Sequence, residues 1–261
     1  MALFNHARDY FPVSINIERA KELDPEKSYM IGYHPHGIIG IGCLVNFMSE
    51  ANNISSIYPD HNIRVATLNM HFAFPIWSEY FKALGFISAN KSSIKNHLTR
   101  KCSKGKKYSV VIVVGGASEA LDAHPGTLDL TLKKRKGFFK LALQTGTSLV
   151  PCLSFGENDV FNQINNGHGT FLRKAQKWLT KIFTFSLPLV YGHGKLMCMP
   201  AKTPITTIMG RPVIVKEPIE HPTANEILEL QERYMAELKA VFDEHKEKLG
   251  KNLKTPLRFV H

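Results

Sequence analysis

The sequence predicts an α/β protein whose mostly parallel sheet is flanked by helices. Residues 108–116, YSVVIVVGG, form an uninterrupted β-branched run. Such a run is typical of a central parallel strand, because helices cover both of its faces. Strand patterns also alternate with helical patterns along the chain, which favours parallel strands joined by right-handed crossovers. With 261 residues the chain is long enough for one substantial core, so we expect residues 1–261 to form a single domain.

The first half of the chain contains two of these strand and helix pairs. Residues 28–33, SYMIGY, have the composition of a buried strand, and the apolar residues 37–51 predict a helix that starts at its first glycine. Residues 63–69, IRVATLN, predict the next strand. Residues 74–85 then predict an amphipathic helix closed by its final glycine.

Three further elements surround the central strand in sequence. Residues 92–105 predict a helix that is capped by its leading serines and ends at a glycine. Residues 137–146 predict a short helix with a glycine at each end, and residues 147–155 predict another buried strand. Pro151 lies inside that strand, so we expect the strand to be bulged or near an edge of the sheet.

Two amphipathic helices are expected in the second half. Residues 170–183 place Trp178 and other apolar side chains on one face and four basic side chains on the other. This pattern fits a helix in a bilayer interface and equally an ordinary helix that covers the sheet. Residues 224–250 carry an apolar stripe at three-and-four spacing, which predicts core packing.

Charge and composition narrow the classes of partner. The chain has 33 Lys and Arg against 22 Asp and Glu, a net charge of +11, which favours an anionic bilayer, a phosphate-bearing small molecule or nucleic acid. Motifs of nucleic-acid binding do not accompany the charge, so we expect no nucleic-acid partner. The four cysteines are scattered without a CxxC pair, which indicates neither a disulfide framework nor a zinc site. We predict no signal peptide and no transmembrane helix.

Polar side chains follow three of the predicted strands. His34 and His36 follow the strand 28–33, Glu119 follows the central strand, and Glu157 with Asn158 follows the strand 147–155. In an open α/β sheet the ligand crevice lies at the carboxyl ends of the strands. We therefore expect these groups to gather in one site.

The segment HPHG, residues 34–37, carries the chemistry of that site. A histidine beside a carboxylate titrates near neutral pH and is equipped to take a proton from a hydroxyl. Pro35 biases His34 toward extended geometry, and Gly37 allows a sharp turn. Amides at the start of the next helix would then face the crevice and bind an oxyanion or a phosphate. We expect His36 to be the base and His34 to be a buried supporting residue.

Other readings of these residues are less favoured. His-x-His is also a metal-ligand pattern, but no Asp follows within the motif, and the remaining histidines lack ligand spacing. The sequence GIIGIG reverses the dinucleotide fingerprint, and no G-x-S-x-G elbow provides a serine nucleophile. Direct attack by a substrate hydroxyl is therefore favoured. The basic residues 133–136 precede a predicted helix N-terminus, which suggests a phosphate site or a solvated loop.

Several segments together resemble the diacylglycerol acyltransferase type-two family, which also includes monoacylglycerol and wax-alcohol acyltransferases. They occur in the family's order and cover nearly the whole chain. The matching stretches are RDYFP (8–12), HPHG (34–37), VGGASEAL (114–121), the long block from Arg135 to Phe161 that contains FGEN, and PITTIMG (204–210).

The resemblance implies an acyl-CoA-dependent O-acyltransferase with a glycerolipid-acyltransferase-like fold and no cofactor. It would act on mono- or diacylglycerol, in triacylglycerol and neutral-lipid synthesis, at the cytosolic face of the endoplasmic reticulum membrane or on lipid droplets. We expect catalysis by His36, His34 and Glu119, with Glu119 as the orienting carboxylate. The acyl-CoA site would comprise Arg135, Lys134, Lys136, Gly137 and Phe138, and the other motif residues are Pro35, Gly37, Gly115, Gly116, Glu157 and Asn158.

This chain departs from the family pattern in three respects. The related H-x-x-x-x-D motif would need an Asp where Ile39 or Ile41 stands. The hydrophobic hairpin with which members usually begin is expected to be missing, and residues 191–205 look shortened. Residues 23–37 and 186–194 resemble monoacylglycerol-using members more closely. A metal-dependent hydrolase, a wax-alcohol acyltransferase and a catalytically silent lipid-surface protein are the alternatives.

Overall fold

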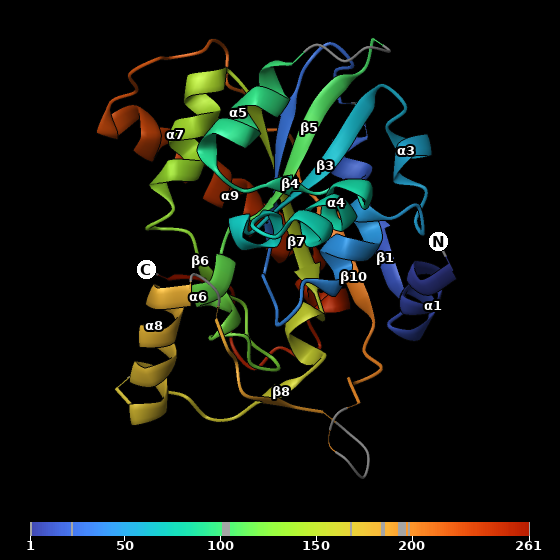
Figure 1. The fold of residues 1–261 in the computed structure, drawn as a ribbon, viewed down its shortest axis with the longest axis vertical. Coiled ribbons are helices and arrows are strands. Elements are labelled where there is room, and N and C mark those ends of the chain that lie inside the picture. Colours follow the sequence, from blue (N-terminus) through green and yellow to red (C-terminus); the bar gives the residue numbers. More distant parts are fainter. Residues whose placement is uncertain are drawn as a thin grey trace.

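The computed structural model describes residues 2–21, 23–100, 105–167, 169–183, 186–192, 197 and 199–260, without the side chains of Ala2 and Phe183. In this part of the chain a seven-stranded sheet forms the centre of the fold (Figure 1). The strands lie in the order β1 (Val13–Asn16), β10 (Ile205–Met209), β7 (Ser148–Phe155), β2 (Tyr29–His34), β5 (Lys107–Val113), β3 (His61–Thr67) and β4 (Ile87–Ser88).

The sheet is mostly parallel, as the sequence predicts. Strands β7, β2, β5, β3 and β4 run parallel to one another. Strands β1 and β10 run parallel to each other, and β10 pairs with β7 in the antiparallel sense. The predicted α/β class is confirmed, with one antiparallel pair between the second and third strands of the sheet, β10 and β7.

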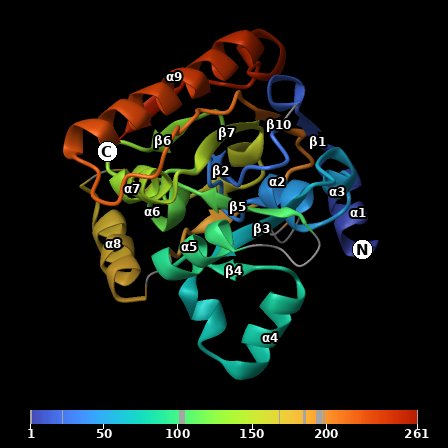
Figure 2. The same ribbon diagram turned by 90° about the horizontal axis from the view of Figure 1, so that it is seen from above.

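Helices cover both faces of the sheet. Met30 packs into a core with α5 (Lys91–Thr99), α7 (Lys136–Thr145) and α9 (Ala224–Leu249). The next residue along β2, Ile31, packs on the opposite face against residues of α2, η2 and α3. Consecutive residues of a strand point to opposite faces, so each buried strand contributes to both cores. Figure 2 shows α9 along one side of the molecule and α4 projecting from the other.

The remaining elements connect or border these layers. Strands β6 and β11 form a short parallel pair, and β8 and β9 form an antiparallel pair. The bounds are α1 (Ala2–Tyr10), η1 (Glu18–Ala20), α2 (Ile41–Cys43), the π-helical η2 (Leu44–Met48), α3 (Ile54–Ile57), η3 (Asn69–Phe72), α4 (Pro75–Ala83), α6 (Gly116–Ala120), β6 (Asp129–Thr131), η4 (Glu157–Asp159), β8 (Asn162–Gln163), α8 (Phe171–Phe183), β9 (Val190–Tyr191) and β11 (Arg258–Val260).

Two helix starts differ from the prediction. The helix expected to begin at Gly37 begins at Ile41, because Gly37 and Gly40 both adopt positive φ and carry the chain through a turn first. Helix α5 begins at Lys91, with Asn90 rather than a serine as its N-cap: the Asn90 side chain accepts the Ser93 amide.

Of the two alternatives predicted for Pro151, the position near an edge is wrong, whereas the pairing beside it is bulged: two residue steps from Pro151 to Leu149 lie opposite three steps from Gly210 to Val213. Strand β7 is an interior strand, hydrogen-bonded to β10 on one side and to β2 on the other. The Pro151 carbonyl accepts the amide of Gly210 at 2.7 Å, so the ring nitrogen faces the same side, where β10 has already ended at Met209. The missing N–H therefore leaves no ladder hydrogen bond unmade.

Candidate active site

The three polar groups meet at one edge of the sheet. Strands β7, β2 and β5 are neighbours and run in parallel, so the residues after Phe155, Tyr33 and Val113 lie together. Hydrogen bonds then link these segments to one another, with Glu119 bound to the HPHG segment and Glu157 bound to Tyr33. The expected gathering at the carboxyl ends of the strands is therefore observed.

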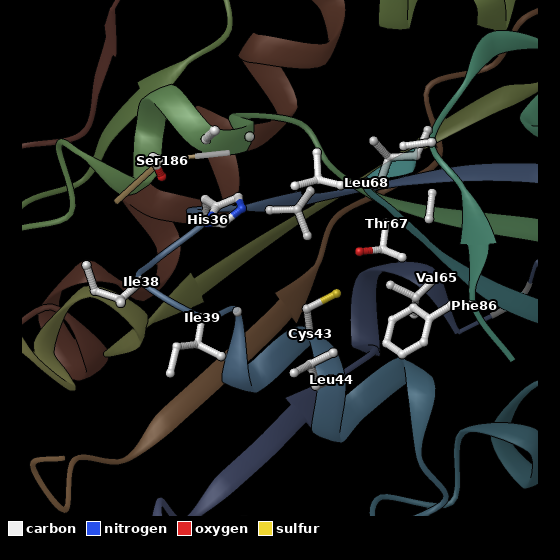
Figure 3. Close-up of a pocket in the computed structure, with 17 residues that line it drawn as sticks. His36, Ile38, Ile39, Cys43, Leu44, Val65, Thr67, Leu68, Phe86 and Ser186 are labelled. Carbon is white, nitrogen blue, oxygen red and sulfur yellow. The ribbon is translucent and has the colours of Figure 1, made fainter. Parts of the chain in front are cut away.

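His36 lies at the rim of an apolar cavity of about 290 Å³, here called the His36 cavity. Figure 3 shows its ring on one side and the apolar side chains of Leu44, Val65 and Phe86 on the other. Its Nδ1 is 2.9 Å from the carbonyl oxygen of Gly37. A carbonyl only accepts hydrogen bonds, so Nδ1 carries the proton and Nε2 keeps its lone pair.

Burial favours the neutral form of this imidazole. It lowers the pKa of His36 below the ordinary value of 6.5, against a smaller opposing effect of the Gly37 carbonyl, and the nearby Arg135 guanidinium lowers it further. At neutral pH the ring is thus uncharged, with a free Nε2 able to accept a proton.

Glu119 holds the backbone of the histidine loop. Its Oε1 accepts the amide of His36 at 2.6 Å, and its Oε2 accepts the amide of Thr131 at 2.6 Å. We expected an orienting carboxylate on the imidazole, but the carboxylate binds the main chain, and the Gly37 carbonyl binds the ring. Burial raises the pKa of Glu119 to about 7, because desolvation outweighs the two amide donors and Arg135.

The two glycines before Glu119 make this arrangement possible. A Cβ on Gly115 would lie 2.1 Å from the Glu119 carboxyl carbon, so only glycine leaves room for the carboxylate. Gly116 adopts a φ of +58°, which glycine tolerates best.

His34 is fully buried and lies beneath the site. Its Nε2 is 3.0 Å from the hydroxyl of Tyr234, and that hydroxyl donates to the carbonyl of Gly32 at 3.1 Å. The hydroxyl must then accept from Nε2–H, so Nδ1 is unprotonated and has no hydrogen-bond partner. Burial lowers the pKa of His34 to about 3. This geometry fits the supporting role and leaves His34 no N–H for a substrate oxyanion.

Glu157 and Asn158 form hydrogen bonds that connect different segments of the chain near the site. Glu157 Oε2 accepts the Tyr33 hydroxyl at 2.8 Å and the Gly42 amide at 3.0 Å. The start of α2 is therefore bound by Glu157, and the expectation that its amides face a substrate oxyanion or phosphate is not met. Asn158 donates to the carbonyl of Thr127 at 2.8 Å.

The predicted acyl-CoA residues separate into two groups. Lys134 and Arg135 line a second cavity of about 250 Å³. Lys136 and Gly137 are exposed in the first turn of α7 and do not line it. Phe138 is buried against Tyr234, with ring centroids 5.6 Å apart. It therefore does not line the second cavity, and it packs against the tyrosine that binds His34.

Metal-ligand clusters and membrane-spanning helices are both lacking among the described residues. These contain no group of three or more His, Cys, Asp or Glu side chains able to hold a metal, and the two imidazoles of HPHG each have a separate protein partner. None of the described helices is both long and apolar enough to cross a bilayer. Cys43 and Cys152 are free and buried. The segment 191–205, predicted to be shortened, lies partly outside the described residues.

The fold and site define a class of protein: an α/β protein with a neutral imidazole beside an apolar cavity. The model of the diacylglycerol acyltransferase family matches residues 1–260. The chain belongs to the diacylglycerol acyltransferase family, as its motifs predict.

Curated relatives resemble nearly the whole chain. It is 43% identical to diacylglycerol O-acyltransferase 1 of Schizosaccharomyces pombe, over 91% of this chain and 68% of that protein. It is 39% identical to human 2-acylglycerol O-acyltransferase 1, over 95% and 73% of the two chains. Diacylglycerol O-acyltransferase 2B of Umbelopsis ramanniana is 38% identical, over 97% and 72%. No solved structure matches.

Proposed function

We propose that this protein transfers a fatty acyl group from acyl-CoA to the hydroxyl of a mono- or diacylglycerol, with residues 1–261 as one catalytic domain. The activities for which its relatives are named support the reaction and both acceptors. The observation that carries the proposal is His36, whose free Nε2 adjoins a cavity with the apolar walls that an acyl chain requires. We also infer that the sheet and its HPHG loop form a glycerolipid-acyltransferase-like fold.

The mechanism follows from the protonation state of His36. Nε2 takes the proton of the acceptor hydroxyl as its oxygen attacks the thioester carbonyl carbon. The tetrahedral intermediate collapses, the carbon–sulfur bond breaks, and the leaving CoA sulfur takes the proton from the imidazolium. The Gly37 carbonyl accepts Nδ1–H throughout, which fixes the tautomer and stabilises the positive charge. Glu119 keeps the loop in place through the His36 amide.

The proposed site of action is a lipid surface at the endoplasmic reticulum or on lipid droplets. Both tryptophans of the chain are exposed on helices, Trp77 by 49% on α4 and Trp178 by 62% on α8. Tryptophan favours the boundary between water and lipid. The chain around α4 leads directly into the His36 cavity, because Leu68 and Phe86 on either side of it line that cavity. The exposed Trp77 on α4, whose flanking segments line an apolar cavity, supports access of acylglycerol from a lipid surface.

The function is tested by incubating the purified protein with labelled acyl-CoA and a panel of acceptors in detergent or lipid droplets. The panel contains 2-monoacylglycerol, diacylglycerol and a long-chain alcohol. We expect transfer to at least one acylglycerol. Transfer to the alcohol alone would assign the wax-alcohol reaction instead. Absence of transfer to all three by folded protein would contradict the proposal and favour a silent lipid-surface protein.

A further inference from the structure

A second cavity, on the other side of helix α6 from His36, is lined by four cationic side chains. They are Lys134 and Arg135, which precede α7, and Arg173 and Lys177, which lie on α8. We call this space of about 250 Å³ the cation cavity. The sequence predicted a phosphate site from the basic run at 133–136, but it did not indicate that α8 would supply half of the positive charge.

Two of these four cations, Lys134 and Lys177, are not neutralised by protein groups among the described residues. Arg173 pairs with Asp122 at 2.5 Å and donates to the Leu121 carbonyl at 2.7 Å. Among the described residues, Lys134 and Lys177 form no ion pair, and Asp122 is the only carboxylate that lines the cavity. Four cations, against Asp122 and the buried Glu119 carboxylate that interacts with Arg135, leave an excess of at least two positive charges.

Buried hydrogen-bonding groups in the wall also lack partners. Arg135 donates from Nη2 to the Ser118 hydroxyl at 2.7 Å and to the Gly115 carbonyl, while its Nε has no partner. The Thr131 hydroxyl is buried and unpartnered, and so is Nε of Arg173, a residue that is only 3% exposed. Unmet donors beside uncompensated positive charge are the features of an anion site.

Helix α6 joins the cation cavity to the His36 cavity. Gly116 and Ala117 line the His36 cavity, and Ser118 lines the cation cavity. Glu119 spans the same distance through hydrogen bonds, since it binds the amide of His36 on one side and that of Thr131 on the other. The two cavities thus adjoin the same short helix, and acyl-CoA carries its thioester and its phosphates at the two ends of a long, flexible pantetheine arm.

We propose that the cation cavity binds a phosphate group of acyl-CoA and that α8, through Arg173 and Lys177, forms part of the CoA site. The inference rests on the proposed acyl transfer and deepens it. In this proposal Lys177 contacts a phosphate of acyl-CoA. If α8 were only a helix in a bilayer interface, Lys177 would have no such contact. The other source of the same chemistry is the phosphate of an anionic lipid headgroup.

The test replaces charge at the cavity mouth, where folding is least affected. Lys177→Gln and Lys134→Gln are compared with Lys140→Gln, an exposed lysine of α7 outside the cavity. Each cavity variant should raise KM for acyl-CoA by about tenfold, the equivalent of one charge-assisted hydrogen bond, with little change in kcat. KM for acyl-pantetheine, which has no phosphate, should be the same in all four proteins. Equal KM values for acyl-CoA in wild type and both variants would overturn the proposal.

Binding measurements separate this proposal from the reaction itself. Calorimetry with adenosine 3′,5′-bisphosphate should show weaker binding to Lys177→Gln than to wild type, whether or not acyl transfer occurs. Dephospho-CoA, compared with CoA, then identifies which phosphate is bound. If the variants lose only binding to phosphatidic acid vesicles, with CoA binding unchanged, the cavity serves a lipid headgroup and the CoA assignment is wrong. Turnover absent with both acyl donors would instead contradict the proposed function.

Discussion

Replacing Glu119 with Gln should destabilise the protein and displace His36, the proposed base. Both carboxylate oxygens accept backbone amides, those of His36 and Thr131, each at 2.6 Å. A glutamine has one oxygen, so in either orientation its NH2 group faces an amide donor and one buried amide loses its partner. An unsatisfied buried donor costs about 1–3 kcal/mol. The loop that carries His36 also loses its anchor, and a misplacement of about 1 Å lowers the rate about 100-fold.

Denaturant unfolding and acyl-transfer rates measure the two effects. Glu229→Gln is the matched control, because it removes a carboxylate from the exposed face of α9. We expect Glu119→Gln, and not the control, to lower both the free energy of unfolding and kcat. Wild-type stability and kcat in Glu119→Gln would refute the anchoring role. If Glu119→Gln kept the wild-type kcat but lost stability, the role of Glu119 would be to stabilise the fold and not to position His36.

Two further predictions concern pH and the support of His34. Burial raises the pKa of Glu119 from 4.5 to about 7 in the folded protein, so folding favours its protonated form. The free energy of unfolding should therefore fall as pH rises from 4.5 to 7, and it should fall less steeply in Glu119→Gln. Urea titrations of both proteins at about pH 5 and pH 8 would detect this difference. A steeper fall in the variant would contradict the burial argument. Tyr234→Phe removes the hydroxyl shared by His34 and the Gly32 carbonyl and should cost about 1–3 kcal/mol in thermal or urea unfolding, whereas the exposed Tyr80→Phe should cost little. Equal stability of the two tyrosine variants would show that this buried contact contributes nothing.

Local sequence patterns are sufficient to predict four interior strands of the main sheet, β2, β3, β5 and β7, and the position of the candidate site, but not β1, β4 or β10. The β-branched run became β5, the apolar run with His34 at its end became β2, and both lie in the interior of the sheet. Because their carboxyl ends share an edge, the sequence alone predicts that Glu119 lies near the histidines. The rule that ligands bind at the carboxyl ends of parallel strands depends only on the order and direction of the strands, and the alternation of strands and helices in the sequence indicates a parallel sheet.

Contacts that depend on side-chain packing could not be predicted in the same way. Tyr234 is 200 residues from His34 and forms part of an apolar helical stripe, so nothing local marked it as the histidine's partner. Arg173 and Lys177 were interpreted only as part of a basic helical face. The Gly37 carbonyl replaces the missing Asp, but a backbone acceptor leaves no signal in residue identity. The sequence also does not show that Pro151 lies in an interior strand. A proline fits there because the neighbouring strand β10 ends at Met209, and that end point depends on the tertiary structure.

The central claim is that His36 is the base and His34 its buried support. It is tested most directly by single-turnover acyl transfer from labelled acyl-CoA to acylglycerol, with His36→Gln and His34→Gln compared at equal folded concentration. The account predicts that His36→Gln slows the chemical step by about 100-fold or more, as expected for loss of a general base. His34→Gln should act mainly through stability, with residual activity in the folded fraction. Near wild-type single-turnover rates in His36→Gln, with transfer lost in folded His34→Gln, would contradict it.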